Sequence, residues 1–360
     1  MNKVVLIDAI PVTFQAHNLR LFRYIFVFLL YSFCIAGCEQ ETKPSPLLTL
    51  GGLTMGTTYT IKINEAGMSL PVEKINAEIN NILIDINGKM STYIDDSELS
   101  RINQSTSLSW IPVSPDLYQL LNDAINISQL SNGSFDITVG PLVNLWGFGP
   151  NKSQEIPGTS EISEALSRTG FQQITLRHSP PALQKRRADI YIDLSGIAKG
   201  YAVDKIAEYL EQQNIDNYMV EIGGEIRAKG VNKVAFAWRI GIEKPEVEKR
   251  GVQRVIKLDN IAMATSGDYR NYFEEDGKRY SHTIDPHSGF PITHDLASVT
   301  VLHKFTAWAD ALATAFLVMG KDAAYEIAEK ENLAVLFLQR TETGYKETYT
   351  DAFVDSLLDN

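Results

Sequence analysis

A strand-like segment followed by a helix-like one, in the stretch from Thr54 to Ile86, decides the class of fold. Residues 54–64 read TMGTTYTIKIN, in which bulky and polar side chains alternate as they do in a half-buried β-strand. The apolar residues that follow recur at helical spacing instead, and they are Ile75, Ile79, Ile82, Leu83 and Ile86. The change of period predicts a strand and then a helix.

Outward from this stretch, strands and helices mix without a strict βαβ alternation. Ser114 and Pro115 open a second helix, as a cap residue followed by proline at the first helical position, and the run at residues 131–133 stops it. Two more helices are expected at residues 306–319 and 321–331. Short strand-like runs lie at residues 174–176, 190–194, 218–222, 238–242, 252–258 and 298–303. The pattern predicts an α+β fold with largely antiparallel sheets covered by helices.

The composition is that of a globular protein with an acidic surface. The chain has 360 residues, of which 44% are hydrophobic and 21% charged, and it contains only 2 cysteines. Collagen, low-complexity disorder and a disulfide scaffold are thereby excluded. The formal net charge is -11, and no basic cluster interleaved with aromatic residues occurs, so nucleic acid is not expected as a partner.

The first residues have the pattern of a secretory leader. Arg20 and Arg23 precede the apolar run at residues 24–36, and residues 35–37 are followed directly by Cys38, as in a lipoprotein cleavage box. A transmembrane anchor is the alternative, but the run of about 13 residues is short of the roughly 20 that span a bilayer. We expect residues 1–37 to be a signal peptide, residues 38–50 a tether lipidated at Cys38, and residues 51–360 the folded domain.

Several common catalytic patterns are missing from the sequence. Both cysteines lie in the leader region, which excludes cysteine catalysis and zinc-thiolate sites in the exported body. Ser195 and Ser266 lack the flanking glycines of a nucleophile elbow. There is also no phosphate-binding loop of the Lys-Ser/Thr type and no dinucleotide fingerprint.

One helical segment carries a pair of hard oxygen donors. Asp310 and Thr314 are four residues apart, so their carboxylate and hydroxyl lie on one face of a helix. Such donors suit Mg²⁺ whose coordination is completed by water and a substrate phosphate. The alternative is that Asp310 is a solvated or capping acid and that Thr314 bonds back to its own helix.

An ordered series of short motifs resembles the FAD:protein FMN transferases, the ApbE-type lipoproteins. The motifs are Met55-Gly56-Thr57, Met90-Ser91-Thr92-Tyr93, Gly133-Ser134-Phe135-Asp136, Val139-Gly140-Pro141-Leu142, Asp193-Leu194-Ser195-Gly196, Gly223-Gly224, Thr265-Ser266-Gly267, His282-Thr283-Ile284-Asp285-Pro286 and Asp310-Ala311-Leu312-Ala313-Thr314-Ala315. Each motif alone is weak. In this order, from about residue 54 to 350 and behind a lipoprotein leader, they form a specific match to nearly all of the mature chain.

The resemblance implies a T-fold-related architecture and a Mg²⁺-dependent transfer of FMN from FAD to a threonine or serine hydroxyl of an acceptor protein, with release of AMP. The residues that would contact FAD are Met55, Tyr93, Ser134, Phe135, Asp136, Asp193, Lys199 and Ile284. The metal would be held by Asp310, Thr314 and the main-chain carbonyl of Gly196. Some members carry a second aspartate directly before the threonine, where this chain has Ala313.

The resemblance also implies where the protein works. The acceptors would be flavoprotein subunits of membrane redox pumps of the Nqr and Rnf type, and the chain would be lipid-anchored at the periplasmic face of the inner membrane.

The acceptor hydroxyl needs a base, and His282 is the side chain whose ordinary pKa suits that task. Asp285, in the same loop, would orient the imidazole ring or bind substrate. Two other functions remain open at this point. In an FAD pyrophosphatase, water would replace the acceptor hydroxyl and give FMN and AMP. A non-catalytic flavin-binding lipoprotein would bind FAD and release no AMP.

Overall fold

The computed structural model describes residues 46–64, 70–149, 156–246, 251–269, 272–275 and 278–357. These residues belong to one compact unit, Pro44–Asn360. The expected signal peptide, the lipidation site Cys38 and nearly all of the expected tether lie outside the described residues. None of the helices in the described ranges is long and apolar enough to cross a membrane.

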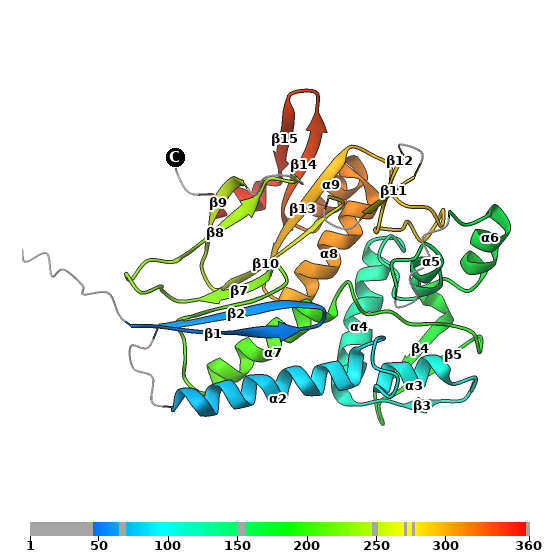
Figure 1. Ribbon diagram of the computed structural model, residues 1–360, viewed down its shortest axis with the longest axis horizontal. Helices are drawn as coiled ribbons and strands as arrows, with labels where there is room; N and C mark the ends of the chain where they lie inside the picture. The colour runs from blue at the N-terminus through cyan, green and yellow to red at the C-terminus, as the bar shows by residue number, and fades with distance from the viewer. Residues whose placement is uncertain are drawn as a thin grey trace, which may run out of the picture. The chain divides into compact units, whose positions relative to one another are not determined.

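An eight-stranded sheet forms the centre of this unit (Figure 1). Its strands are β1 (Leu47–Thr54), β2 (Thr57–Asn64), β6 (Tyr218–Ile222), β7 (Glu225–Lys229), β10 (Ile261–Gly267), β13 (Leu296–His303), β14 (Ala334–Thr341) and β15 (Gly344–Tyr349), in this spatial order. Every neighbouring pair is antiparallel. The predicted α+β class with antiparallel sheets is confirmed.

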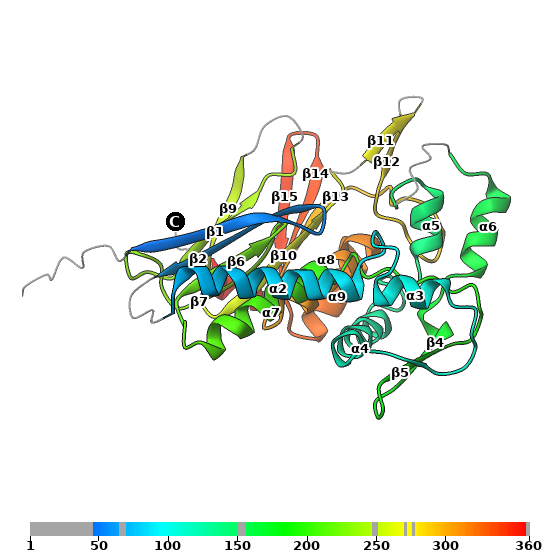
Figure 2. The same ribbon diagram turned by 60° about the horizontal axis from the view of Figure 1, so that its bottom comes forward.

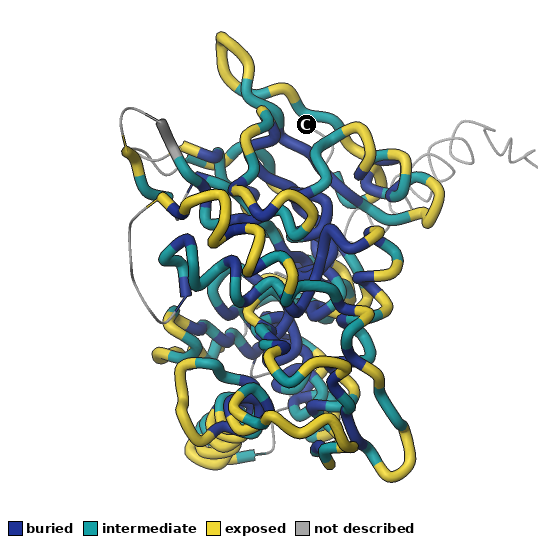
Figure 3. Tube along the Cα trace, turned by 90° about the vertical axis from the view of Figure 1, so that its right-hand side faces the viewer, coloured by how far each residue is buried: buried dark blue, intermediate teal, exposed yellow. Residues whose placement is uncertain are grey.

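Both faces of the sheet are covered. In β14, Val335 and Phe337 enter one hydrophobic core whereas Leu336 and Leu338 enter the other, because successive side chains of a strand point to opposite faces. The larger core packs against α2 (Val72–Met90), α4 (Pro115–Leu130), α7 (Ala198–Gln212), α8 (Thr306–Met319) and α9 (Lys321–Lys330), which Figure 2 shows together. On the other face lie β8 (Trp238–Glu243), β9 (Val252–Leu258) and η2 (Asp351–Ser356). The buried residues accordingly run through the middle of the body (Figure 3).

Smaller elements lie beyond the end of the main sheet. A three-stranded sheet is formed by β3 (Ile111–Pro112), β5 (Ala182–Lys185) and β4 (Ile174–Arg177), with η1 (Phe171–Gln173) before it. The short helices α3 (Glu98–Gln104), α5 (Gly140–Leu145) and α6 (Thr159–Ser167) lie on the same side (Figure 1). A two-stranded hairpin, β11 (Tyr272–Glu275) and β12 (Lys278–Ser281), packs on this region, where Tyr280 stacks on Trp146 with ring centroids 5.6 Å apart.

Helix α8 is almost entirely buried, as its sequence TAWADALATAFLVM predicts for a helix that is apolar on all sides. Its first turn is capped from α7. The carboxylate of Asp204 accepts hydrogen bonds from the amide of Thr306 (2.9 Å), the hydroxyl of Thr306 (2.8 Å) and the amide of Ala307 (3.0 Å). The two helices meet so closely that a Cβ on Gly200 would lie 2.4 Å from the carbonyl oxygen of Thr306. This contact fixes α8 relative to the start of α7.

The strand β1 joins β2 through a two-residue turn at Met55 and Gly56. Both residues have positive φ angles, 48° and 72°, as a type I′ hairpin turn requires. β1 begins at Leu47, so regular structure starts before residue 51, where the folded domain was expected to begin. The expected strand at residues 54–64 is the second arm of this hairpin, β2.

One predicted strand is wrong. Residues 190–194 are apolar in alternation, but they belong to no sheet. The amide and the carbonyl of Ile192 instead bond to the side chain of Asn103, at 2.8 Å each. The side-chain amide takes the place of a neighbouring strand, which strand-like periodicity cannot distinguish from real pairing.

Candidate active site

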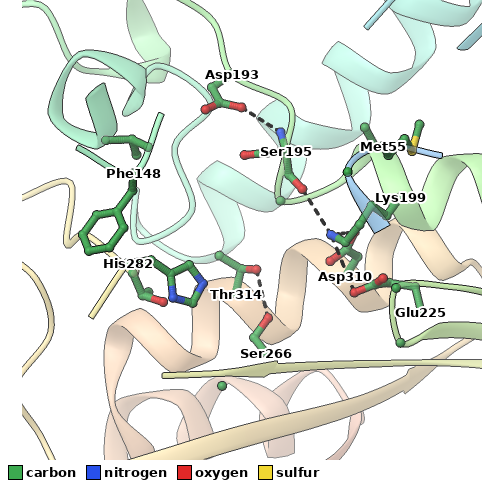
Figure 4. A pocket seen from close by; sticks show the side chains of 18 of the residues that line it. Met55, Phe148, Asp193, Ser195, Lys199, Glu225, Ser266, His282, Asp310 and Thr314 are labelled. Atoms are coloured by element: carbon green, nitrogen blue, oxygen red, sulfur yellow. Dashed lines mark hydrogen bonds and ion pairs between the residues drawn. The ribbon is translucent and has the colours of Figure 1, made fainter. Parts of the chain in front are cut away.

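The ends of several elements surround one large cavity of about 1330 Å³ (Figure 4). Ligand cavities usually measure about 300–1,000 Å³, so this one has room for an extended ligand. Its wall includes the Met55–Gly56 turn, the loop after α2, the segment leading into α7 and one face of α8. The site is thus assembled from segments that are far apart in the sequence.

The cavity gathers nearly all of the predicted site residues. Those that line it are Met55, Tyr93, Ser134, Phe135, Asp136, Asp193, Gly196, Lys199, His282, Ile284, Asp310 and Thr314. Asp285 does not line it. Its carboxylate accepts from the amide of His287 (2.9 Å) and lies 3.1 Å from the Nδ1 atom of that ring. The roles expected for all of these residues stay predictions.

Asp310 is the only charged residue of α8 and is 3% exposed, so its carboxylate needs partners. It accepts a hydrogen bond from the amide of Gly200 at 3.2 Å, and the ammonium of Lys199 lies 3.5 Å from the same oxygen. The contact between α7 and α8 therefore brings a lysine and an aspartate together at the cavity wall.

Glu225 completes a group of three charges with Lys199 and Asp310 (Figure 4). Its Oε1 atom lies 3.6 Å from the ammonium, but its buried Oε2 atom has no hydrogen-bond partner among the described residues. Burial raises the pKa of Glu225 to about 7, and Asp310 adds to this shift while Lys199 opposes it. Burial would lower the pKa of Lys199, but the two carboxylates together raise it above its usual range. The lysine is thus held as a cation beside a carboxyl oxygen that can accept one more hydrogen bond.

Thr314 lies one turn beyond Asp310, and its hydroxyl is 3.0 Å from that of Ser266 at the end of β10. A Cβ built on Gly196 would lie 3.7 Å from the Thr314 hydroxyl, so the segment before α7 approaches α8 here. Ala313, directly before Thr314, is 0% exposed and belongs to the larger hydrophobic core.

The donors present fit Mg²⁺ better than a metal that needs a full set of protein ligands. No group of three or more histidine, cysteine, aspartate or glutamate residues in the described ranges could hold a metal ion. The carboxylate of Asp310 and the hydroxyl of Thr314, both on the cavity wall, suit an ion that usually keeps several waters and binds substrate phosphate.

The turn at Ser134–Asp136 is fixed by Asp136. This carboxylate accepts from the amide and hydroxyl of Thr138 at 2.7 and 2.6 Å, and from the amide of Phe171 at 2.8 Å. Burial raises the pKa of Asp136, although the hydrogen bonds it accepts favour the charged form. The oxygens of Asp136 already have partners in the protein. These hydrogen bonds hold the turn in place, and Asp136 thereby shapes the cavity wall.

His282 lies at the end of the cavity away from Lys199 (Figure 4). The ring of Phe148 packs against it edge-on, with centroids 6.3 Å apart, and Phe148 also contacts Phe273 of β11 at 5.6 Å. Aromatic side chains therefore shield one side of the imidazole from water.

Helix α3 braces two parts of the cavity wall without lining it. The hydroxyls of Ser97 and Ser100 donate to the carbonyl of Ser91, at 2.6 and 3.2 Å, and this holds the loop that carries Tyr93. Asn103 holds Ile192, directly before Asp193.

Sequence reasoning assigned no role to Glu225, Ser266 or Phe148. Ser266 lies within one of the motifs quoted for the resemblance, Glu225 directly follows another, and Phe148 lies outside all of them. An acid directly after Gly223-Gly224 could have been noted as a candidate. Its pairing with Lys199 depends on the packing of β7 against α7.

The chain is similar to several known proteins in sequence and in structure. The sequence model of the ApbE family matches residues 55–337. A curated FAD:protein FMN transferase of Haemophilus influenzae is 49% identical over 325 residues, which cover 89% of this chain and 93% of that protein. One of Vibrio cholerae is 47% identical over 321 residues, covering 89% and 94%. The solved structure of the flavin transferase ApbE from Vibrio cholerae matches with a TM-score of 0.82 and 45% identity, over 87% of this chain and 100% of that one.

Proposed function

The chain belongs to the ApbE family and is an FAD:protein FMN transferase, and we propose that it uses Mg²⁺ to move FMN from FAD to a threonine or serine hydroxyl of an acceptor protein. The observation that carries this proposal is the row of oxygen donors and the cation along one wall of the cavity. Asp310, Thr314 and Lys199 come together there. The negative charge of a diphosphate requires cations, which Lys199 and Mg²⁺ would supply, and Mg²⁺ requires hard oxygen donors.

The transfer is a displacement at phosphorus. The acceptor oxygen forms a bond to the phosphorus of the FMN half, while the bond from that phosphorus to the bridging oxygen breaks and AMP leaves with that oxygen. Asp310, Thr314 and the carbonyl of Gly196 would hold Mg²⁺, which when bound would polarise a phosphoryl oxygen and stabilise the leaving group. Lys199 neutralises further negative charge of the diphosphate. The enzyme needs no covalent nucleophile, because the acceptor supplies it.

We propose that His282 is the general base that accepts the proton of the acceptor hydroxyl. Its imidazole lines the cavity, and Phe148 shields one side of it from water. Asp285 lies next to His287, whose Nε2 atom is 2.9 Å from the carbonyl oxygen of Asn132. In this arrangement Asp285 supports the turn that carries Ser134 and Phe135.

The flavin and adenosine parts of FAD would occupy the remaining wall. Met55 and Tyr93 offer a thioether and an aromatic ring to flat ring systems, and Tyr93 is 67% exposed at the rim. Phe135, Asp193 and Ile284 line the same space.

Asn103→Ala is expected to weaken FAD binding by about fivefold to tenfold, because two hydrogen bonds that hold Ile192 beside Asp193 are lost. Titration of FAD fluorescence measures the dissociation constant. Asn81→Ala is the control, since Asn81 makes an exposed contact on α2. An unchanged dissociation constant for Asn103→Ala would show that α3 does not position the Asp193 segment.

We propose membrane redox-pump subunits of the Nqr and Rnf type as acceptors, and lipidation of Cys38 at the periplasmic face of the inner membrane. The lipoprotein pattern of the first 38 residues supports this location, and the family resemblance supports these acceptors. Mass spectrometry of the membrane-extracted chain tests lipidation: we expect a diacylglyceryl cysteine as the first residue.

The decisive experiment incubates residues 39–360 with FAD, Mg²⁺ and a purified acceptor subunit, and follows both the acceptor's mass and AMP. We expect the acceptor to gain one FMN residue for each AMP released, and EDTA to abolish both products. AMP and free FMN without labelled acceptor would identify a pyrophosphatase instead. Bound FAD without either product would leave only a binding protein.

A further inference from the structure

The strand β1 is an edge of the main sheet that lacks the usual protection against pairing. In the described part of the chain it pairs only with β2 (Figure 2). Natural edge strands commonly carry charges or proline that prevent another strand from joining. β1 reads LLTLGGLT and has neither, whereas the opposite edge, β15, carries Lys346 and Glu347.

The hairpin geometry turns free backbone groups of β1 outward. Thr54 and Thr57 flank the two-residue turn and so form the hydrogen-bonded closing pair. Because hydrogen-bonded and non-hydrogen-bonded pairs alternate in an antiparallel ladder, Leu53, Gly51 and Thr49 present their N–H and C=O groups to the outer edge. Side chains leave this edge accessible, since Gly51 and Gly52 have none and Leu53 is 83% exposed.

The same strand leads into the cavity. β1 ends at Thr54, and the next two residues, Met55 and Gly56, line the cavity wall. A strand paired with β1 would therefore have one end at the rim of the site. Pairing with a sheet edge is a recurrent way in which proteins bind extended peptides.

We propose that β1 is the docking strand for the acceptor polypeptide, whose extended segment next to the acceptor hydroxyl pairs with β1 as a ninth strand. The inference rests on the proposed function, because a protein hydroxyl must then reach the cavity. The absence of charged side chains on β1 indicates which kind of segment can pair with it. Leu47–Thr54 carries no charge in a chain whose net charge is -11, so it fits an uncharged segment and gives no ionic contact to a charged one.

The test compares variants of Leu53 in the full chain, with a purified acceptor subunit of a membrane redox pump as substrate. Leu53→Pro removes an outward N–H that β2 does not use, and Leu53→Lys adds a charge like that on β15. We expect both to raise the KM for the acceptor about tenfold, with kcat and the dissociation constant of FAD unchanged. Leu53→Thr retains the N–H and is expected to stay within about twofold of wild type.

The outcomes separate this proposal from its alternatives. An unchanged KM in a folded Leu53→Pro variant overturns it, and if that variant does not fold, Leu53→Lys decides in the same way. A wild-type dimer that Leu53→Lys dissociates without a change in KM would assign the edge to a second copy of the chain, which also overturns it. If the wild type labels no acceptor, the proposed function fails and the docking proposal fails with it; labelling with an unchanged KM removes the docking proposal alone.

Discussion

Asp310→Asn is expected to lower the rate of FMN transfer about a thousandfold while the chain stays folded. Asparagine has the same shape, so its side-chain oxygen can still accept from the amide of Gly200, which now lies 3.2 Å from the carboxylate. The substitution removes the one carboxylate that the proposed metal site contains. The effect should appear at saturating FAD, because charge stabilisation at phosphorus is lost and not only ground-state binding.

The measurement is acceptor mass against time, together with a Mg²⁺ titration of the rate. We expect the concentration of Mg²⁺ for half-maximal rate to rise strongly in Asp310→Asn. Asp322→Asn is the matched control, since its side chain is 93% exposed on the next helix. A loss of less than about tenfold with unchanged Mg²⁺ dependence would remove Asp310 from the metal site.

His282→Ala is expected to lower the transfer rate by about a hundredfold to a thousandfold, within the range usual for the loss of a general base. FAD binding should change little, because the proposed task of His282 concerns the acceptor proton. The rates are measured as single turnovers with the variant and with the wild type.

A matched variant is His178→Ala, since His178 is an exposed ring that packs on Tyr118 away from the cavity lining. Its rate should equal that of the wild type. If His282→Ala keeps the wild-type rate, another group takes the proton. If the variant loses FAD binding in proportion to its rate, His282 is a binding residue.

The sequence predicts much of the fold wherever local chemistry sets an element. Helix α4 starts after Ser114, whose hydroxyl accepts from the amide of Leu117, with proline as its first residue, as expected. Helix α8 has the expected bounds because its apolar run ends at Gly320, whose φ of 77° ends the helix. The expected ApbE-like fold class is confirmed by the similar solved structure.

Long-range pairing could not be predicted in the same way. Most of strand β1 precedes residues 54–64, the segment that was interpreted as a strand. Its place in the sheet depends on its pairing with β2, which the turn at Met55 sets. In the supposed strand at residues 190–194, the backbone of Ile192 bonds to a side chain 89 residues away. The alternation of apolar residues indicates which face of a strand is buried, but it does not indicate which segment or side chain bonds to the strand's backbone.

In the candidate site, too, local features could be predicted from the sequence and long-range contacts could not. Asp310 and Thr314 could be paired from their spacing on a helix, and both line the cavity. Glu225 could not be placed beside Lys199, because their proximity arises from the packing of β7 against α7. The position of Asp285 beside His287, outside the cavity lining, likewise follows from the conformation of a loop.

If the chain is lipid-anchored as we propose, the start of β1 at Leu47 would limit how far from a bilayer the enzyme can work. With Cys38 lipidated, as we propose, only the residues numbered 39–46 separate the anchor from the sheet, and eight residues extend to at most about 28 Å. The first residue of the docking strand is then held within the thickness of one small domain from the lipid headgroups. Acceptor segments close to the membrane surface would be within reach, whereas soluble proteins further out would have to approach the membrane to be labelled. The short tether would thus act as a spatial filter on acceptors.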